Sequence, residues 1–313
     1  MLNIVLDPPR WNPLTEGLRF DASFPSRTLN TLFKSVSLRE AIRFYRANSD
    51  RFEAVHYTTA LTGRPFPTSP PSEITDVHDD VWPNSPSAYL LSTYYRHLVE
   101  GLRHSPYLIT VTRVLKNKLA SRGFTGHIEA IYQPVDDHFS LMEDKRGLRE
   151  MLKLPTDKIL LLSVASAERR KNRERIVQAV RELGPKHILV NVGPPLEGGI
   201  AFRGVDDERL NAIYNACDLL LFPSLYEGQG MPIAEAFATG LPVVTSDTPE
   251  LREVTGGAAI LVNPLDPSSI AAGVRQALQS HDELVDLGTR RAPVFAFDRF
   301  RDKILAFYNS IKV

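Results

Sequence analysis

Residues 224–240 have the sequence SLYEGQGMPIAEAFATG, which links a predicted strand to a predicted helix. The apolar run Asp218–Phe222 just before it predicts a buried strand, Pro232 is typical of a first helical turn, and Gly240 is typical of a helix end. A glycine-containing loop stands between the two elements. In parallel α/β sheets, ligands bind at the carboxyl ends of strands beside helix N-termini. The stretch therefore predicts a ligand site as well as a fold.

Apolar runs and helical patterns alternate on both sides of this stretch. The predicted strands are Ile159–Ala165, His187–Val192, Asp218–Phe222, Pro242–Ser246 and Ala258–Val262. The predicted helices are Asn172–Leu183, Asp207–Ala216, Pro232–Thr239, Pro249–Val254 and Pro267–Gln279. Because the strands are apolar on both faces, they fit a parallel sheet with helices on both sides. The fold class is therefore α/β, and the alternation predicts a doubly wound domain.

The first half of the chain has a less regular pattern of the same kind. Its predicted strands are Leu2–Leu6, Glu53–Tyr57, Ile74–Val77, Tyr107–Thr112 and Ile128–Ile131. Its predicted helices are Leu38–Ala47, Ser87–Arg103 and Val114–Arg122, the last with Thr112 as its N-cap. We therefore expect a second α/β domain, and we expect the boundary between the domains within the polar segment Pro134–Pro155.

The composition limits the class of protein. A chain of 313 residues is long enough for two domains of ~150 residues each. A hydrophobic fraction of 43 % and a charged fraction of 24 % exclude a disordered or fibrous chain. Lys and Arg (37) balance Asp and Glu (37), which argues against general electrostatic binding of nucleic acid. The single cysteine, Cys217, excludes an internal disulfide framework and a cysteine-built zinc site. We find neither an apolar run of ~18 residues nor a signal-peptide pattern, and we expect a cytoplasmic protein.

Two carboxylates frame the glycine loop of residues 224–240. Glu227 precedes the loop, and Glu235 is expected in the first turn of the following helix. Gly228 and Gly230 allow the backbone to approach a ligand closely and to offer N–H donors. A carboxylate accepts hydrogen bonds in pairs, which suits the vicinal hydroxyls of a ribose or a hexose. Alternatively, Glu235 compensates the helix dipole and Glu227 is a solvated loop residue, but the combination with the glycines favours a ligand site.

A run of charged residues, Glu168–Arg175 (ERRKNRER), follows the first strand of the second domain and opens a predicted helix. Its five basic residues are unfavourable beside the positive end of a helix dipole. A bound phosphate would reverse that cost, because phosphates bind both helix N-termini and basic side chains. The alternative is a solvated charged turn in which Glu168 and Glu174 are the local partners.

In the first domain, Ile74–Pro83 (ITDVHDDVWP) predicts a strand that ends in a His-Asp-Asp turn. His78 is the candidate functional group in this turn, and the alternative is a histidine of the core or of the surface. No second histidine stands at ligand spacing, so we expect no metal site.

A second feature of the first domain is Leu29–Phe52, where five basic residues alternate with apolar ones. A basic amphipathic helix can lie on an anionic membrane, which would make a peripheral membrane contact. The alternative is an ordinary domain helix with a solvated basic face.

The stretch 224–240 is similar to the E-x7-E segment of retaining family 4 glycosyltransferases (glycosyl transferases group 1) of the GT-B fold, and the resemblance covers residues 155–280. It implies that Glu235 holds the ribose hydroxyls of the donor and that Glu227 contacts the transferred sugar. It also implies that backbone N–H groups of the loop meet sugar hydroxyls or phosphate; these belong to Gln229, Gly230 and Met231. Members usually carry an aromatic residue where Gln229 stands.

The same resemblance extends to three further elements. ERRKN resembles the segment that clamps the donor diphosphate, which implies this role for Arg170 and Lys171. The segment after Gly204 resembles the one that contacts the nucleobase through its backbone, which makes Val205 a candidate. The turn with His78 resembles a His-Asp element that faces the donor sugar. The N-terminus departs from the family, because 7–20 holds one glycine where members have a glycine-rich loop, and the acceptor stays unassigned.

Together these resemblances imply a GT-B enzyme with two Rossmann-like doubly wound domains that face a cleft. Residues 1–140 would form the acceptor-side domain, with the helix 298–313 packing back on it, and residues 141–297 would bind the nucleotide sugar. The implied reaction is metal-independent, retaining transfer of a hexose from GDP-mannose or a UDP-sugar to a glycan, lipid or small-molecule acceptor, without a cofactor. Alternatives are a nucleotide-sugar epimerase or sugar phosphorylase on this fold, or a non-catalytic sugar-nucleotide-binding protein.

Overall fold

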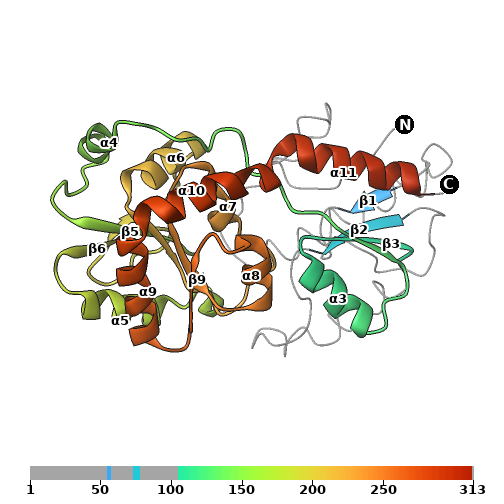
Figure 1. The fold of residues 1–313 in the computed structure, drawn as a ribbon, viewed down its shortest axis with the longest axis horizontal. Helices are drawn as coiled ribbons and strands as arrows, with labels where there is room; N and C mark the ends of the chain where they lie inside the picture. The colour runs from blue at the N-terminus through green and yellow to red at the C-terminus, as the bar shows by residue number, and fades with distance from the viewer. Residues whose placement is uncertain (1–54, 58–72, 78–104, 312–313) are drawn as a thin grey trace. The chain divides into compact units, whose positions relative to one another are not determined.

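The computed structural model describes residues 55–57, 73–77 and 105–311 (Figure 1). The chain divides into two units, one of residues 1–130 with 306–313 and the other of residues 131–305. The sequence pattern predicts the division after residue 140 and the whole helix 298–313 in the first unit. The last helix, α11 (Phe297–Ser310), instead has its first part in the second unit and only its end in the first.

The second unit is built on a six-stranded parallel sheet in the order β10-β9-β8-β5-β6-β7. Its strands are β5 (Ile159–Val164), β6 (His187–Val192), β7 (Ile200–Phe202), β8 (Leu219–Phe222), β9 (Val243–Ser246) and β10 (Ile260–Val262). All five strands predicted for this half are present. The sequence did not indicate β7, because three residues at a half-exposed sheet edge are too few to show a periodic pattern.

Helices cover both faces of this sheet (Figure 1). They are α4 (Lys145–Met151), η3 (Arg169–Lys171), α5 (Arg173–Leu183), α6 (Asp207–Ala216), α7 (Met231–Ala238), α8 (Pro249–Thr255), α9 (Pro267–Gln279), α10 (His281–Arg291) and η4 (Ala292–Phe295). Successive strand residues point to opposite faces, so Leu160 and Leu162 pack with α4, α6, α7 and α8, while Leu161 packs with α5 and α9. All three leucines are fully buried, which explains why the strands are apolar throughout.

The order of the strands reverses between β5 and β8. From β5 the chain proceeds outward through β6 to β7, whereas from β8 it proceeds in the other direction through β9 to β10. Leu161 and Leu162 of β5 pair in parallel with Leu219 and Leu220 of β8, so the loops after these two strands emerge at the same edge of the sheet. A reversal of this kind is the usual ligand-binding position in an open α/β sheet.

The described part of the first unit contains a parallel sheet in the order β1-β2-β3-β4. Its elements are β1 (Val55–Tyr57), β2 (Glu73–Val77), β3 (Tyr107–Thr110), α3 (Arg113–Ser121) and β4 (His127–Ala130). Thr112 is confirmed as the N-cap of α3, since its hydroxyl accepts a hydrogen bond from the Leu115 N–H at 3.2 Å. The end of α11 packs on this unit, where the Phe307 ring lies 6.3 Å from the Tyr107 ring.

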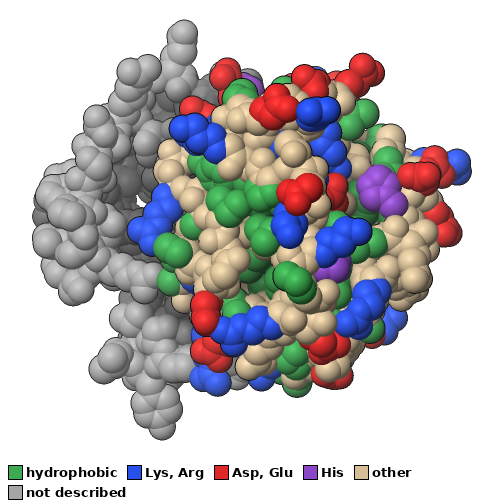
Figure 2. All heavy atoms as spheres, turned by 90° about the vertical axis from the view of Figure 1, so that its left-hand side faces the viewer, with side chains coloured by type: hydrophobic (Ala, Val, Ile, Leu, Met, Phe, Trp, Pro, Cys, Tyr) green, Lys and Arg blue, Asp and Glu red, His purple; other side chains and the backbone are tan. Residues whose placement is uncertain are grey.

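Charges of both signs are mixed on one face of the second unit. On the face that Figure 2 presents, Lys and Arg side chains alternate with Asp and Glu over the described residues, with small apolar areas between them. On this face the two signs of charge are therefore interspersed rather than segregated. Within the described ranges, no helix is both long and apolar enough to span a membrane.

Candidate functional site

The loops that follow β5 and β8 are joined to one another at the reversal of strand order. Asn172 adopts a left-handed conformation (φ 56°, ψ 33°) between η3 and α5, and its Nδ2 donates to the carbonyl of Pro223 at 2.9 Å and to that of Pro264 at 2.6 Å. The Leu225 N–H donates to the carbonyl of Arg170 at 2.7 Å. These bonds, from side chain and backbone, hold both loops in one arrangement at the carboxyl edge of the sheet.

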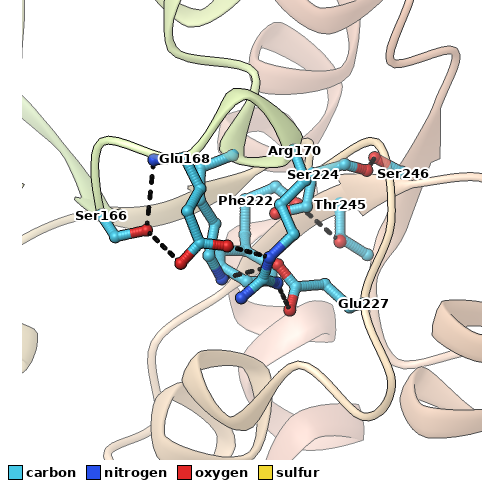
Figure 3. A network of polar contacts seen from close by, with 9 residues as sticks. Ser166, Glu168, Arg170, Phe222, Ser224, Glu227, Thr245 and Ser246 are labelled. Atoms are coloured by element: carbon cyan, nitrogen blue, oxygen red, sulfur yellow. Dashed lines mark hydrogen bonds and ion pairs between the residues drawn. The ribbon is translucent and has the colours of Figure 1, made fainter. Parts of the chain in front are cut away.

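A buried carboxylate between these loops forms hydrogen bonds to two basic side chains (Figure 3). The two oxygens of Glu227 accept hydrogen bonds from Arg170 Nη1 at 2.7 Å and from Lys171 Nζ at 2.6 Å. The Glu227 side chain is only 7 % exposed, and those of Lys171 and Arg170 are 11 % and 31 % exposed. Lys171 Nζ also lies 4.8 Å from the centre of the Phe222 ring. The two cations are therefore positioned by one buried anion while Arg170 keeps access to solvent.

Arg170 has a second acidic partner, Glu168, whose Oε2 accepts from Arg170 Nε at 2.6 Å. Burial tends to raise the pKa of Glu168, but the hydrogen bond and charge of Arg170 outweigh this, so the pKa lies below its usual value. The four side chains Glu168, Arg170, Lys171 and Glu227 together form a charge-balanced cluster, which we call the switch-point cluster. A dianionic ligand that binds Arg170 and Lys171 would have to share these two cationic side chains with Glu227.

Two other arginines of the ERRKNRER run, Arg173 and Arg175, have different roles. Arg173 Nη2 donates to the backbone carbonyls of Pro194 at 3.1 Å and Pro195 at 2.6 Å, which ties the start of α5 to the loop after β6. Arg175 Nη1 donates to Asn172 Oδ1 at 3.0 Å. The structure thus separates arginines that stabilise loops from the Arg170 and Lys171 pair, a distinction that their order in the sequence does not reveal.

The loop after β8 leads into α7 through Gly230. This residue has φ 76°, a backbone conformation that favours glycine, and an added Cβ would press against the Leu251 side chain at 3.1 Å. A glycine N-cap offers no side chain to the first-turn N–H groups of α7, where Met231 is the first helical residue. Gly228 and Gln229 are buried beside it. The N-terminus of α7 therefore resembles other helix ends that bind anions.

Glu235 lies one residue further along α7 than the sequence indicated, because the helix begins at Met231 rather than at Pro232. Because α7 begins at Met231, Glu235 is its fifth residue and lies outside the first turn, where a helix dipole acts most strongly. Its Oε2 accepts a hydrogen bond from Tyr214 Oη at 2.5 Å. Burial raises the pKa of Glu235 to about 7, although the bond from Tyr214 opposes the shift. The position of Glu235 and its bond from Tyr214 therefore do not fit a residue that only compensates the helix dipole.

A family model matches the part of the chain that contains these groups. Residues 158–280 match the model of glycosyl transferases group 1. We call residues 158–280, the segment that matches this model, the group 1 domain. This chain is 42 % identical over 96 residues to O-antigen chain mannosyltransferase B of Escherichia coli, a match that covers 30 % of this chain and 25 % of that protein. It is 38 % identical over 112 residues to MMP alpha-(1->4)-mannosyltransferase of Mycolicibacterium hassiacum, covering 34 % of this chain and 27 % of that one. The matches thus span about a quarter of these relatives.

Solved structures resemble this chain over most of its length, beyond the group 1 domain alone. Sucrose-phosphate synthase from Thermosynechococcus elongatus matches with a TM-score of 0.77 at 20 % identity, over 96 % of this chain and 86 % of that one. Anabaena HepE in complex with UDP-glucose matches with a TM-score of 0.71 at 15 % identity, over 88 % and 82 %. These likenesses confirm the predicted GT-B fold, with its two parallel-sheet Rossmann-like units.

Two side chains of the group 1 domain have roles that the sequence did not reveal. Tyr214 is fully buried on α6, and its burial raises its pKa well above the usual value, so the hydroxyl remains a donor to Glu235. Gln229 uses its side chain to bind the backbone of Gln133 at the start of the second unit. A tyrosine in an amphipathic helix and a glutamine in a loop carry no signal for such distant partners.

The remaining predicted residues are placed as follows. Val205 is half-buried and packs against the same core as Phe202 and Tyr214, one residue before the α6 N-cap Asp206. His78 lies outside the described residues, as do the 7–20 and 29–52 segments. In the portion of the chain that the structure describes, no group of three or more His, Cys, Asp or Glu side chains is arranged to hold a metal ion.

Proposed function

We propose that the group 1 domain binds a nucleotide diphosphate sugar and that the chain transfers the hexose of this donor to an acceptor hydroxyl. The observation that carries the proposal is the switch-point cluster, in which the buried Glu227 holds Arg170 and Lys171 at the edge where β5 and β8 end. Two cations beside a helix N-terminus suit a diphosphate. The names of the matched mannosyltransferases, and the UDP-glucose in the HepE complex, support a donor of this class.

In the proposed reaction, the bond between the sugar C1 and the diphosphate oxygen breaks, and a bond between C1 and the acceptor oxygen forms. Arg170 and Lys171 stabilise the negative charge that grows on the leaving diphosphate. The acceptor proton passes to a leaving phosphate oxygen on the same face of the sugar, which would retain the anomeric configuration. No protein nucleophile is then required, and Glu227 and Glu235 act as hydrogen-bond acceptors for sugar and ribose hydroxyls.

The donor site is tested with the Glu235→Ala variant. Removing a charged acceptor from buried hydroxyls should weaken binding of a nucleoside diphosphate and of its sugar conjugate together by about 1.5–3 kcal/mol. Isothermal titration calorimetry with UDP, GDP and their sugar conjugates measures both. Glu283→Ala, in the first turn of α10, is the control for a pure helix-dipole effect and should leave binding unchanged. Equal affinities in wild type and Glu235→Ala would show that the ribose site lies elsewhere.

The raised pKa of Glu235 predicts that donor binding depends on pH. Only the ionised form offers both oxygens as acceptors, and with a pKa of about 7 the ionised fraction rises about tenfold between pH 6 and pH 8. Affinity for the nucleoside diphosphate should therefore rise by up to this factor, with release of a proton. Titrations of wild type and Glu235→Gln at pH 6, 7 and 8 separate this group from the phosphate, which titrates in both. Parallel pH profiles would contradict the assignment.

The folding stability contributed by Glu235 depends on pH in the opposite direction to donor binding. The folded-state pKa of Glu235 lies above its value of 4.5 in an unfolded chain, so the folded protein binds this proton more tightly. The contribution is fully present below pH 4.5 and is lost as the pH rises through about 7. Protonation of Glu235 therefore stabilises the ligand-free protein and at the same time weakens donor binding.

We also propose that transfer requires no metal ion, because Arg170 and Lys171 supply the charge that a metal would otherwise provide for the diphosphate. We expect the initial rate of transfer to be unchanged in excess EDTA. Complete loss of transfer in EDTA, with recovery on addition of Mg²⁺ or Mn²⁺, would overturn this part of the proposal.

A further inference from the structure

Among the contacts of segment 131–135, where the chain enters the second unit, are hydrogen bonds to three other parts of that unit. The Tyr132 hydroxyl donates to Glu253 Oε1 on α8 at 2.8 Å. The Val135 N–H donates to the carbonyl of Phe295 in η4 at 2.9 Å. The third attachment joins Gln133 to Gln229, in the loop between β8 and α7. We call residues 131–135 the connecting segment and residues 225–231 the donor loop.

The Gln133–Gln229 attachment uses both halves of one side-chain amide. Gln229 Oε1 accepts from the Gln133 N–H at 2.7 Å, and Gln229 Nε2 donates to the Gln133 carbonyl at 3.0 Å. This reciprocal pattern also assigns the orientation of the amide, because exchanging its oxygen and nitrogen would oppose donor to donor and acceptor to acceptor. Gln229 is only 4 % exposed, so water cannot readily replace either bond.

The position of Gln229 makes this attachment relevant to the site. It stands two residues after Glu227, which holds Arg170 and Lys171, and one residue before Gly230, which opens α7. Its Nε2 also lies 3.4 Å from the sulfur of Met231. Any displacement of this loop therefore pulls on both bonds to Gln133. An aromatic or aliphatic side chain at position 229 could fill the same volume, but it could not bind a backbone N–H and carbonyl together.

We propose that Gln229 is a positioning residue that joins the donor loop and the connecting segment into one structural unit. A ligand that binds and stabilises the donor loop would therefore also stabilise the connecting segment, where the chain enters the second unit. The link between the two segments follows from the hydrogen bonds of Gln229 alone. The effect of a bound ligand on the connecting segment, which we call the transmission, rests on the proposed function, because it requires a ligand at the donor loop.

The joining is tested without a ligand by amide hydrogen–deuterium exchange. Gln229→Met keeps the length of the side chain but removes both bonds, and it should accelerate exchange roughly tenfold in 131–135 and in 225–231 together. Gln229→Glu keeps an acceptor for the Gln133 N–H and should restore part of the protection. Tyr132→Phe is the matched control, because it removes a bond from the same segment to α8 and should accelerate exchange in 131–135 alone. Faster exchange in only one of the two segments of Gln229→Met would overturn the proposal.

Transmission is tested by repeating the exchange with saturating UDP or GDP. In wild type and in Tyr132→Phe, the nucleotide should protect both segments; in Gln229→Met it should protect the donor loop alone. Protection of 131–135 that persists unchanged in Gln229→Met would overturn the transmission. If neither nucleotide protects 225–231 in the wild type, the proposed donor site is wrong, and the ligand-free comparison still decides the joining. If Gln229→Met does not fold, as judged by circular dichroism, the graded loss in Gln229→Glu provides the same comparison.

Discussion

Arg170→Ala and Lys171→Ala should each lower the rate of sugar transfer by roughly a hundredfold, equivalent to about 3 kcal/mol of transition-state stabilisation. Negative charge on the leaving diphosphate grows as the C1–O bond breaks, so contacts to it strengthen in the transition state. Both cations are already held in place by Glu227 at 2.6–2.7 Å, so they need little reorganisation. Single-turnover transfer assays measure the effect, beside titrations with the nucleoside and the nucleoside diphosphate.

The two ligands and a third variant make this test specific. Affinity for the uncharged nucleoside should stay unchanged, whereas affinity for the diphosphate should fall. Arg175→Ala removes the same charge from the same run, but Arg175 binds Asn172 rather than Glu227, and its effect on the rate should be small. Melting curves identify any loss of folding that follows from leaving the buried Glu227 with one cation. Wild-type rates in both variants would mean that this run is only a charged turn.

Asp218→Ala should lower the free energy of unfolding by up to about 3–5 kcal/mol, the usual cost of removing one partner of a buried ion pair. The Asp218 side chain is 23 % exposed, so the full cost is an upper bound. Asp218 Oδ2 accepts from Arg149 Nη2 and from the Leu160 N–H, both at 2.7 Å, and Oδ1 accepts from Lys145 Nζ at 2.9 Å. The Arg149 side chain is only 8 % exposed and also binds the carbonyl of Ala216 at 2.8 Å. Removing Asp218 leaves this guanidinium buried with its charge uncompensated. Urea denaturation of the two proteins measures the difference.

An exposed ion pair and a double variant provide the controls. Asp298→Ala removes a surface partner of Arg301 and should leave stability nearly unchanged, because solvent screens an exposed pair. The variant that combines Asp218→Ala with Arg149→Leu removes both buried charges and should be more stable than Asp218→Ala alone. If the double variant loses the sum of the two single effects, the pair is not coupled and the explanation is wrong.

The same pair predicts how stability responds to acid. Burial tends to raise the pKa of Asp218, but the Leu160 N–H, Lys145 and Arg149 together hold it below the usual 3.8. A lowered folded-state pKa contributes stability that is present above pH 3.8 and is lost as the pH falls through the folded value. Asp218→Ala should therefore show a shallower loss of stability than wild type at pH below 3.8.

Much of the second unit could be predicted from local sequence patterns. Continuous apolar runs indicated β5, β6, β8, β9 and β10, and the helices that alternate with them were indicated by amphipathic patterns and by Pro267 and Gly240 near helix ends. Each of these signals acts within a few residues, so each is visible in a single stretch of chain. The short edge strand β7 lacks such a signal, and so does the exact start of α7, which placed Glu235 outside the first turn.

The candidate site could likewise be predicted only in part. The residue types and spacing of ERRKN and of Glu227 and Glu235 are enough to indicate a site for phosphates and hydroxyls. The pairing of Glu227 with Arg170 and Lys171 depends on residues that are 57 and 56 positions apart in the chain. Only the adjacency of β5 and β8 in the sheet brings these two loops together.

By itself, the sequence determined the α/β class and the alternation of strands and helices in the second half, and it supplied residue types suited to phosphates and hydroxyls, because these depend on side-chain chemistry and near neighbours. The tertiary structure alone decided the partners of those residues. Tyr214 meets Glu235 because α6 packs beside α7, and Gln229 meets Gln133 although 96 positions separate them. Contacts of this kind arise from the order of strands in the sheet, which closes long loops of chain and has no counterpart in any single stretch of sequence.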